Sequence, residues 1–85
     1  MKALRPVQSR FLHEIAKDIR DDWQGMPLDA IVLTGALSNA NWIDDTVNGV
    51  SARMVIMRLL PKTTGWKGDK AKRIKNELKA LCGMR

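Results

Sequence analysis

The sequence predicts an all-α protein, a compact bundle of about four helices at approximately residues 6–24, 28–47, 51–60 and 69–82. Apolar residues recur at steps of three and four along most of the chain, as on one face of an α-helix. Glycine or proline stands close to each expected helix end. The 85 residues suit a single domain, 1–85, and the 45% that are hydrophobic suffice for one core.

The first expected helix covers residues 6–24. Pro6 fits its first turn, where the missing N–H of proline has no intrahelical partner to lose. Glu14 is spaced to pair with Arg10 or Lys17 on the polar side. Gly25 and Pro27 follow the expected end of the helix. The apolar stripe that predicts this helix consists of Val7, Phe11, Leu12, Ile15, Ile19 and Trp23.

A second stripe predicts one long helix over residues 28–47, with Asn48-Gly49 as its C-cap. The segment Ser38–Asn41, "SNAN", contains poor helix formers, so the continuity of this helix stays open. A strand at Ala30–Thr34 is less favoured, because no second β-like segment is present to pair with it. The stripe consists of Leu28, Val32, Ala36, Ala40, Ile43 and Val47.

Two shorter helices complete the bundle. Ser51 can cap a helix at 51–60 whose apolar residues lie on more than one face, so we expect this helix to be deeply buried. Its Met54 and Met57 are accordingly assigned to the core rather than to a partner groove. Residues 62–67 are expected to form a loop, and Gly68 is expected to start the last helix. The apolar face of that helix consists of Ala71, Ile74, Leu78, Leu81 and Cys82.

Positive charge is concentrated at the C-terminal end of the chain. Residues 1–61 contain seven basic and seven acidic side chains, whereas residues 62–85 contain eight basic and two acidic ones, which gives the whole net charge of +6. A charge excess confined to one segment is typical of binding to a polyanion. On the last helix we expect Arg73 and Glu77 to pair with each other. The helix expected at 69–82 would place Lys72, Lys75 and Lys79 along one side. The candidate nucleic-acid-binding residues are Lys62, Lys67, Lys70, Lys72, Lys75 and Lys79.

Catalytic and metal-binding patterns are not found in the sequence. The only histidine, His13, lacks the second histidine that a zinc-protease helix needs, and the single cysteine, Cys82, excludes both an intrachain disulfide and a paired-cysteine metal site. The segment "PKTTGWKGDK" is not a phosphate loop, because Asp69 follows the second glycine where lysine is required. Asp44 and Asp45 lack the glutamate that closes a calcium loop. We therefore expect no enzyme, no metal and no cofactor.

The same features indicate a location. The N-terminal residues contain no apolar stretch of the secretory type, and the longest aliphatic run, Ala30–Leu33, is far too short to span a bilayer. The lone cysteine is typical of a reducing compartment. We expect a soluble, cytoplasmic protein without a membrane partner.

Three sequence stretches resemble small helical proteins encoded in prophages and other mobile elements. They are "IAKDIRDDW", "IDDTVNG" and "MRLLPKTTGWKGDKAKRIKNEL". In those proteins a tryptophan, a basic residue and a glycine precede a helix of this kind, as Trp66, Lys67 and Gly68 do here. The matching helix positions are Ala71, Ile74, Lys75, Glu77 and Leu78. The resemblance implies a helical fold and a mobile-element origin, but no chemistry, and "SNAN" departs from it.

Two functions follow as hypotheses. The first is a small basic accessory protein that binds nucleic acid through backbone contacts from its C-terminal helix. The alternative is a non-catalytic protein-interaction module or host-factor modulator, with Trp42 as the candidate contact residue, because tryptophan is enriched at binding hot spots. Trp66 is interpreted as a packing residue at the start of the last helix. The molecular target and the oligomeric state stay open.

Overall fold

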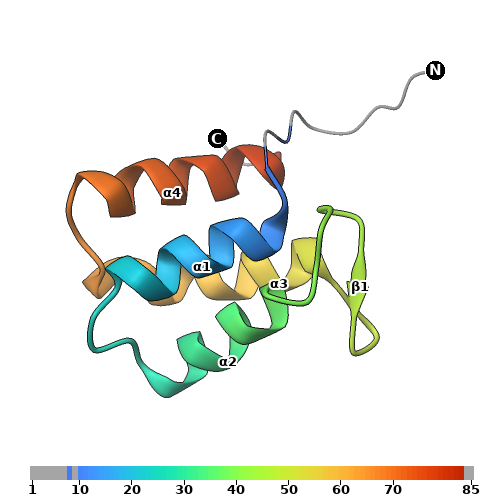
Figure 1. Cartoon of the computed structure of the whole chain (residues 1–85), viewed down its shortest axis with the longest axis horizontal. Coiled ribbons are helices and arrows are strands. Elements are labelled where there is room, and N and C mark those ends of the chain that lie inside the picture. The colour runs from blue at the N-terminus through green and yellow to red at the C-terminus, as the bar shows by residue number, and fades with distance from the viewer. Residues whose placement is uncertain (1–7, 9, 84–85) are drawn as a thin grey trace.

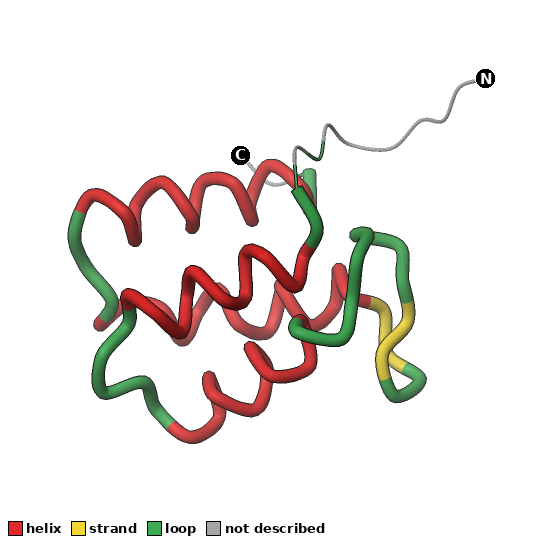
Figure 2. The backbone as a smooth tube through the Cα atoms, viewed as in Figure 1, coloured by secondary structure: helices red, strands yellow, loops and turns green. Residues whose placement is uncertain are grey.

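The mostly α-helical bundle expected from the sequence is confirmed by a computed structural model, which describes residues 8 and 10–83 (Figure 1). Figure 2 shows that one small hairpin interrupts the helices. In chain order the elements are α1 (Leu12–Asp22), α2 (Leu28–Leu37), β1 (Thr46–Val47), β2 (Val50–Ser51), α3 (Ala52–Leu59), the 3₁₀-helix η1 (Leu60–Gly65) and α4 (Asp69–Leu81).

The start of α1 lies later than the sequence predicted. Residues 8, 10 and 11 are not helical, and the remaining predicted positions, 6, 7 and 9, lie outside the described residues. The backbone N–H groups of Leu12 and His13 donate to the carbonyl groups of Asn41 and Ala40, at 3.0 and 2.9 Å. Because these N–H groups bond to a distant segment, the first turn of α1 is fixed at this point by tertiary contacts.

The predicted helix over 28–47 is wrong beyond Leu37. The Ser38 hydroxyl donates to the Thr34 carbonyl at 3.2 Å, and the Asp45 carboxylate accepts from the N–H groups of Asn41 and Trp42, at 2.8 and 2.9 Å. Short polar side chains of this kind compete with the helical backbone hydrogen bonds. The segment "SNAN" therefore ends α2.

Asn48-Gly49 is the turn of a β-hairpin and not a helix C-cap. Strand β1 pairs antiparallel with β2, with Val47 opposite Val50, which leaves two residues in the turn. Both have positive φ, 53° and 79°, as a type I′ turn requires. Asn-Gly between two β-branched residues is a strong hairpin signal, and it was present in the sequence.

The hairpin leads directly into α3. The Ser51 hydroxyl accepts from the Met54 N–H at 3.1 Å, which confirms Ser51 as the N-cap. After Leu59 the chain continues as η1, so most of the loop predicted at 62–67 is a 3₁₀-helix. The buried Thr63 hydroxyl donates to the Leu60 carbonyl at 2.7 Å and stabilises this turn.

The core lies where the four helices meet. In Figure 1, α1 lies between α4 and α2, and α3 passes behind it. The closest helix pairs are α2 with α3, α1 with α2, and α1 with α4, and η1 links α3 to α4. The largest fully buried side chains of this core are Leu12, Ile15, Ile19, Thr34, Leu37, Ile43, Ile56, Leu59, Leu78 and Leu81.

The orientation of α2 differs from the prediction. Leu28 and Val32, assigned to the core stripe, are 77% and 64% exposed, whereas Ala30 and Thr34 are fully buried. Leu37 is buried on the same side as Ala30 and Thr34, so packing against the neighbouring helices selects this face of an α2 that is apolar on more than one side.

Candidate nucleic-acid interface

The start of α4 is fixed by a buried tryptophan pair. Trp66 is 3% exposed, and its ring stacks on that of Trp23 with the centroids 5.3 Å apart and the planes inclined by 8°. The indole N–H of Trp66 donates to the Asp22 carboxylate at 2.8 Å. Gly68, with φ of +114°, then turns the chain into α4. The motif predicted as a packing segment thus joins the end of α1 to the start of α4.

Lys75 is held against the same tryptophan. Its ammonium group donates to the Trp66 carbonyl and lies 5.9 Å from the centroid of the indole ring. Burial, together with the nearby charges of Lys67 and Lys79, lowers the pKa of the Lys75 amine below its ordinary value of 10.5. The lysine therefore has a fixed position and is surrounded by like charge.

The other lysines of this face point to solvent. Lys67, Lys72 and Lys79 are exposed. Along α4, Lys72 lies three residues before Lys75 and Lys79 lies four residues after it, so both are its neighbours on the helix surface. We call Lys67, Lys72, Lys75 and Lys79 the basic face. No carboxylate is among the groups that shift the pKa of Lys75. The basic face is a cluster of positive charge on the outer side of α4.

Two of the predicted lysines lie outside this cluster. The Lys62 ammonium group forms an ion pair with Asp29 at 2.8 Å, and this contact lowers the pKa of the Asp29 carboxyl. Lys70 is half-buried and close enough to Asp21 to lower the pKa of that carboxyl, after the larger effect of Lys17. Both charges are thus partly compensated within the protein.

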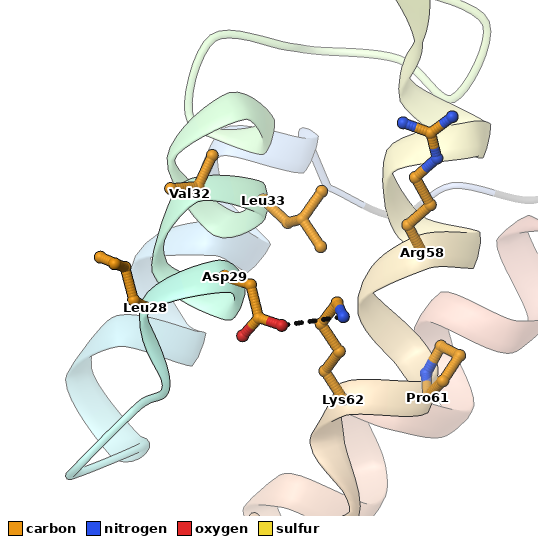
Figure 3. Close-up of a pocket in the computed structure, with 7 residues that line it drawn as sticks. All are labelled: Leu28, Asp29, Val32, Leu33, Arg58, Pro61 and Lys62. Carbon is orange, nitrogen blue, oxygen red and sulfur yellow. Dashed lines mark ion pairs between the residues drawn. The ribbon is translucent and has the colours of Figure 1, made fainter.

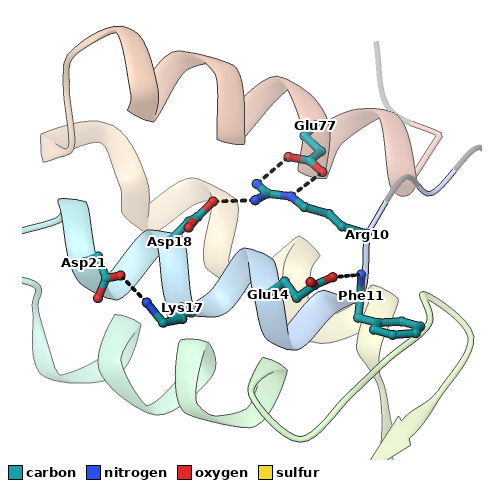
Figure 4. Close-up of polar contacts among 7 residues, drawn as sticks. All are labelled: Arg10, Phe11, Glu14, Lys17, Asp18, Asp21 and Glu77. Carbon is teal, nitrogen blue, oxygen red and sulfur yellow. Dashed lines mark hydrogen bonds and ion pairs between the residues drawn. The ribbon is translucent and has the colours of Figure 1, made fainter.

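The expected pairing of Arg73 with Glu77 is replaced by a longer-range contact. The Arg10 guanidinium donates to both Glu77 oxygens, at 3.1 and 2.9 Å, and also to the Asp18 carboxylate (Figure 4). Both carboxylates raise the pKa of Arg10, with Glu77 contributing most. Because Arg10 uses Glu77, the Arg73 charge is not cancelled by its helical neighbour.

The start of α1 also differs in its pairing. The Glu14 carboxylate accepts from the Phe11 N–H at 2.8 Å, as in the second half of a capping box (Figure 4). Arg10, which the sequence spacing offered to Glu14, lies with Asp18 and Glu77 instead. Lys17 pairs with Asp21 at 2.8 Å.

An apolar groove between α2 and the α3–η1 segment was missed by the sequence analysis. It has a volume of about 810 Å³ and is lined by Leu28, Asp29, Val32, Leu33, Arg58, Pro61 and Lys62. Asp29 and Leu33 project from α2 towards the side that carries Arg58 and Lys62 (Figure 3). Met54 and Met57, assigned to the core, are 42% and 43% exposed. The aliphatic wall of the groove comes from α2 and Pro61, and the signal in the sequence was an α2 that is apolar on more than one side.

Trp42 lies at another part of the surface. It is 36% exposed, and its ring meets that of Phe11 edge-on at 5.2 Å. Phe11 is 40% exposed and stacks on the exposed His13 at 5.4 Å. With Gln8, Arg10 and Glu14, this aromatic pair lines a hollow of about 210 Å³.

Cys82, the residue that follows α4, is half-buried. Burial raises the pKa of the Cys82 thiol, whose sulfur lies 3.8 Å from the Arg53 carbonyl oxygen. Among the described residues, histidine, cysteine, aspartate and glutamate side chains form no group of three that could hold a metal ion.

Comparison with protein-family models, with curated proteins and with solved structures finds no match to this chain. The similarity to mobile-element proteins therefore remains a prediction from the sequence motifs. In residues 8 and 10–83, no helix combines the length and the apolar character that crossing a membrane demands.

Proposed function

We propose that this protein is a small, non-catalytic cytoplasmic accessory protein of a phage or other mobile element, and that it binds nucleic acid through the phosphate backbone. The basic face carries the proposal: three lysines lie on one side of α4 and Lys67 lies just before the helix, close enough that Lys67 and Lys79 depress the pKa of Lys75. Phosphate groups would relieve this repulsion. The mobile-element context is supported by the quoted sequence motifs.

The side chains of the basic face suit backbone binding rather than base reading. Lysine acts as a point charge, whereas the bidentate recognition of guanine uses the planar guanidinium group of arginine. Lys75 contributes a charge already positioned by Trp66, so less side-chain entropy is lost when a phosphate binds. We therefore expect binding that depends strongly on salt and weakly on sequence.

The test is a salt titration of binding to mixed-sequence duplex DNA and, separately, to single-stranded RNA. Replacing Lys67, Lys72 and Lys79 with glutamine should reduce the magnitude of the slope of log K against log salt by about 2.7 on duplex DNA. Lys75 is left in place because it packs on Trp66. The control replaces Lys17, Arg20 and Arg58 with glutamine, which removes the same charge from other faces. Equal slopes for the two variants would disprove the assignment of the site.

A protein-interaction module is the second candidate, and the exposure of apolar side chains favours it. Trp42 is partly exposed beside the exposed Phe11, as that hypothesis requires. The groove between α2 and α3 exposes more aliphatic surface still. Such surfaces on a small chain are typical of protein contacts.

A further inference from the structure

The groove between α2 and the α3–η1 segment is not used by the proposed nucleic-acid function. We propose that it binds an amphipathic α-helix of a different protein, with aliphatic side chains on the face that enters the groove and acidic side chains at the edge. The groove is about 810 Å³ in volume and mainly aliphatic (Figure 3). This is a second, independent site, because none of its lining residues belongs to the basic face.

Two aliphatic side chains of the groove are strongly exposed. Leu28 and Val32, which line the groove from α2, are 77% and 64% exposed. The core of the domain is complete without these side chains, so their burial would contribute directly to binding.

The shape of the groove selects a helix over other peptide forms. Its walls are two helices, which is the geometry of helix-in-groove recognition. Addition of a β-strand needs a sheet edge, and the hairpin β1–β2 contributes no residue to the groove. A proline-rich segment requires aromatic walls, and the groove is lined by aliphatic and charged residues. The groove is open, so a small apolar molecule would remain largely in water.

The charges at the rim select an acidic partner. Asp29 forms its ion pair with Lys62, whereas Arg58 takes part in none of the ion pairs among the described residues. One carboxylate near two cations leaves the rim with a positive excess, which a glutamate or aspartate on the edge of the bound helix would neutralise. A second copy of this chain fits less well, because each copy has a net charge of +6 and would bring a rim of the same sign.

The experiment is a selection from a displayed library of helical peptides about five turns long, randomised at both apolar and charged positions, against the full chain. We expect the enriched peptides to carry aliphatic residues at helical spacing and acidic residues beside them. Fluorescence anisotropy then measures the affinity of an enriched peptide. The double variant Leu28→Gln/Val32→Gln should weaken binding by at least about tenfold, because two aliphatic contacts are lost.

Matched variants separate the groove from general effects. Trp42→Gln removes exposed apolar surface elsewhere and should change the affinity less than about twofold. Arg58→Gln should weaken binding about two- to fivefold, and more than Arg20→Gln, which removes the same charge from α1. Circular dichroism verifies that each variant is folded. The groove variants should leave the salt dependence of nucleic-acid binding unchanged, so the two proposals fail separately.

Three outcomes would overturn the proposal. The enriched peptides could bind the Leu28→Gln/Val32→Gln variant as well as the original chain, which would place them outside the groove. They could be rich in lysine or proline instead of acidic residues. Sedimentation equilibrium could also show a dimer that the same double variant dissociates, in which case a second copy covers the groove.

Discussion

Replacement of Trp66 by alanine tests the tertiary contact on which the start of α4 depends. The side chain is 3% exposed, stacks on Trp23 and donates to Asp22, so the change leaves a large cavity and removes a hydrogen bond. Truncation of a buried tryptophan costs about 3–5 kcal/mol. An 85-residue domain has a free energy of unfolding of about 4–13 kcal/mol in total. The variant should therefore lose more than about 12 °C in Tm, or fail to fold.

Trp66→Phe keeps the test quantitative if the alanine variant does not fold. It retains an aromatic ring against Trp23 but loses the indole N–H bond to Asp22, so we expect a loss of about 1–2 kcal/mol. The assay is urea unfolding followed by far-ultraviolet circular dichroism. The matched control is Trp42→Phe, at a position 36% exposed, with an expected effect within about 0.5 kcal/mol. Equal effects of the two phenylalanine variants would refute the reasoning.

Three further predictions concern a turn, an ion pair and a titrating amine. Gly49→Ala should lower the free energy of unfolding by about 1 kcal/mol, because φ of +79° disfavours a Cβ atom. Arg10→Gln should cost about 1–2 kcal/mol, since it leaves Glu77 without its bidentate partner, and a double-mutant cycle with Glu77→Gln measures the coupling. Burial and two neighbouring lysines lower the pKa of Lys75 in the folded state below the value of 10.5 that applies to the unfolded chain. Between these two pKa values the unfolded chain binds more protons than the folded chain, so protonation of Lys75 favours unfolding. The free energy of unfolding should therefore rise as the pH approaches 10.5, and Lys75→Gln should reduce this rise in urea titrations.

Each of these three has its own control. Gly65→Ala changes a glycine without positive φ and with open space around the Cβ position, so it should not destabilise the protein. A coupling near zero between positions 10 and 77 would show that the ion pair contributes nothing. An unchanged rise with pH in the Lys75→Gln variant would assign the rise to other groups.

The local sequence determined most of the helices, because a short-range pattern specifies each of them. Apolar residues at steps of three and four, Ser51 as an N-cap and Gly68 before α4 act within a few residues, and all three features are present in the structure. The β1–β2 hairpin was also specified by a short stretch of sequence. Asn48-Gly49 between two valines is sufficient to specify it, and the extended apolar periodicity across Ala40, Ile43 and Val47 hid it, since these residues are buried without being helical.

The tertiary structure alone decided which apolar and charged side chains are available at the surface. The buried face of α2 carries Ala30, Thr34 and Leu37, and this orientation leaves Leu28 and Val32 exposed. Arg10 and Glu77 are far apart in sequence, and their pairing replaces the local one with Arg73. Helical spacing specifies neighbours on one helix, whereas contacts between helices depend on packing that no short segment contains.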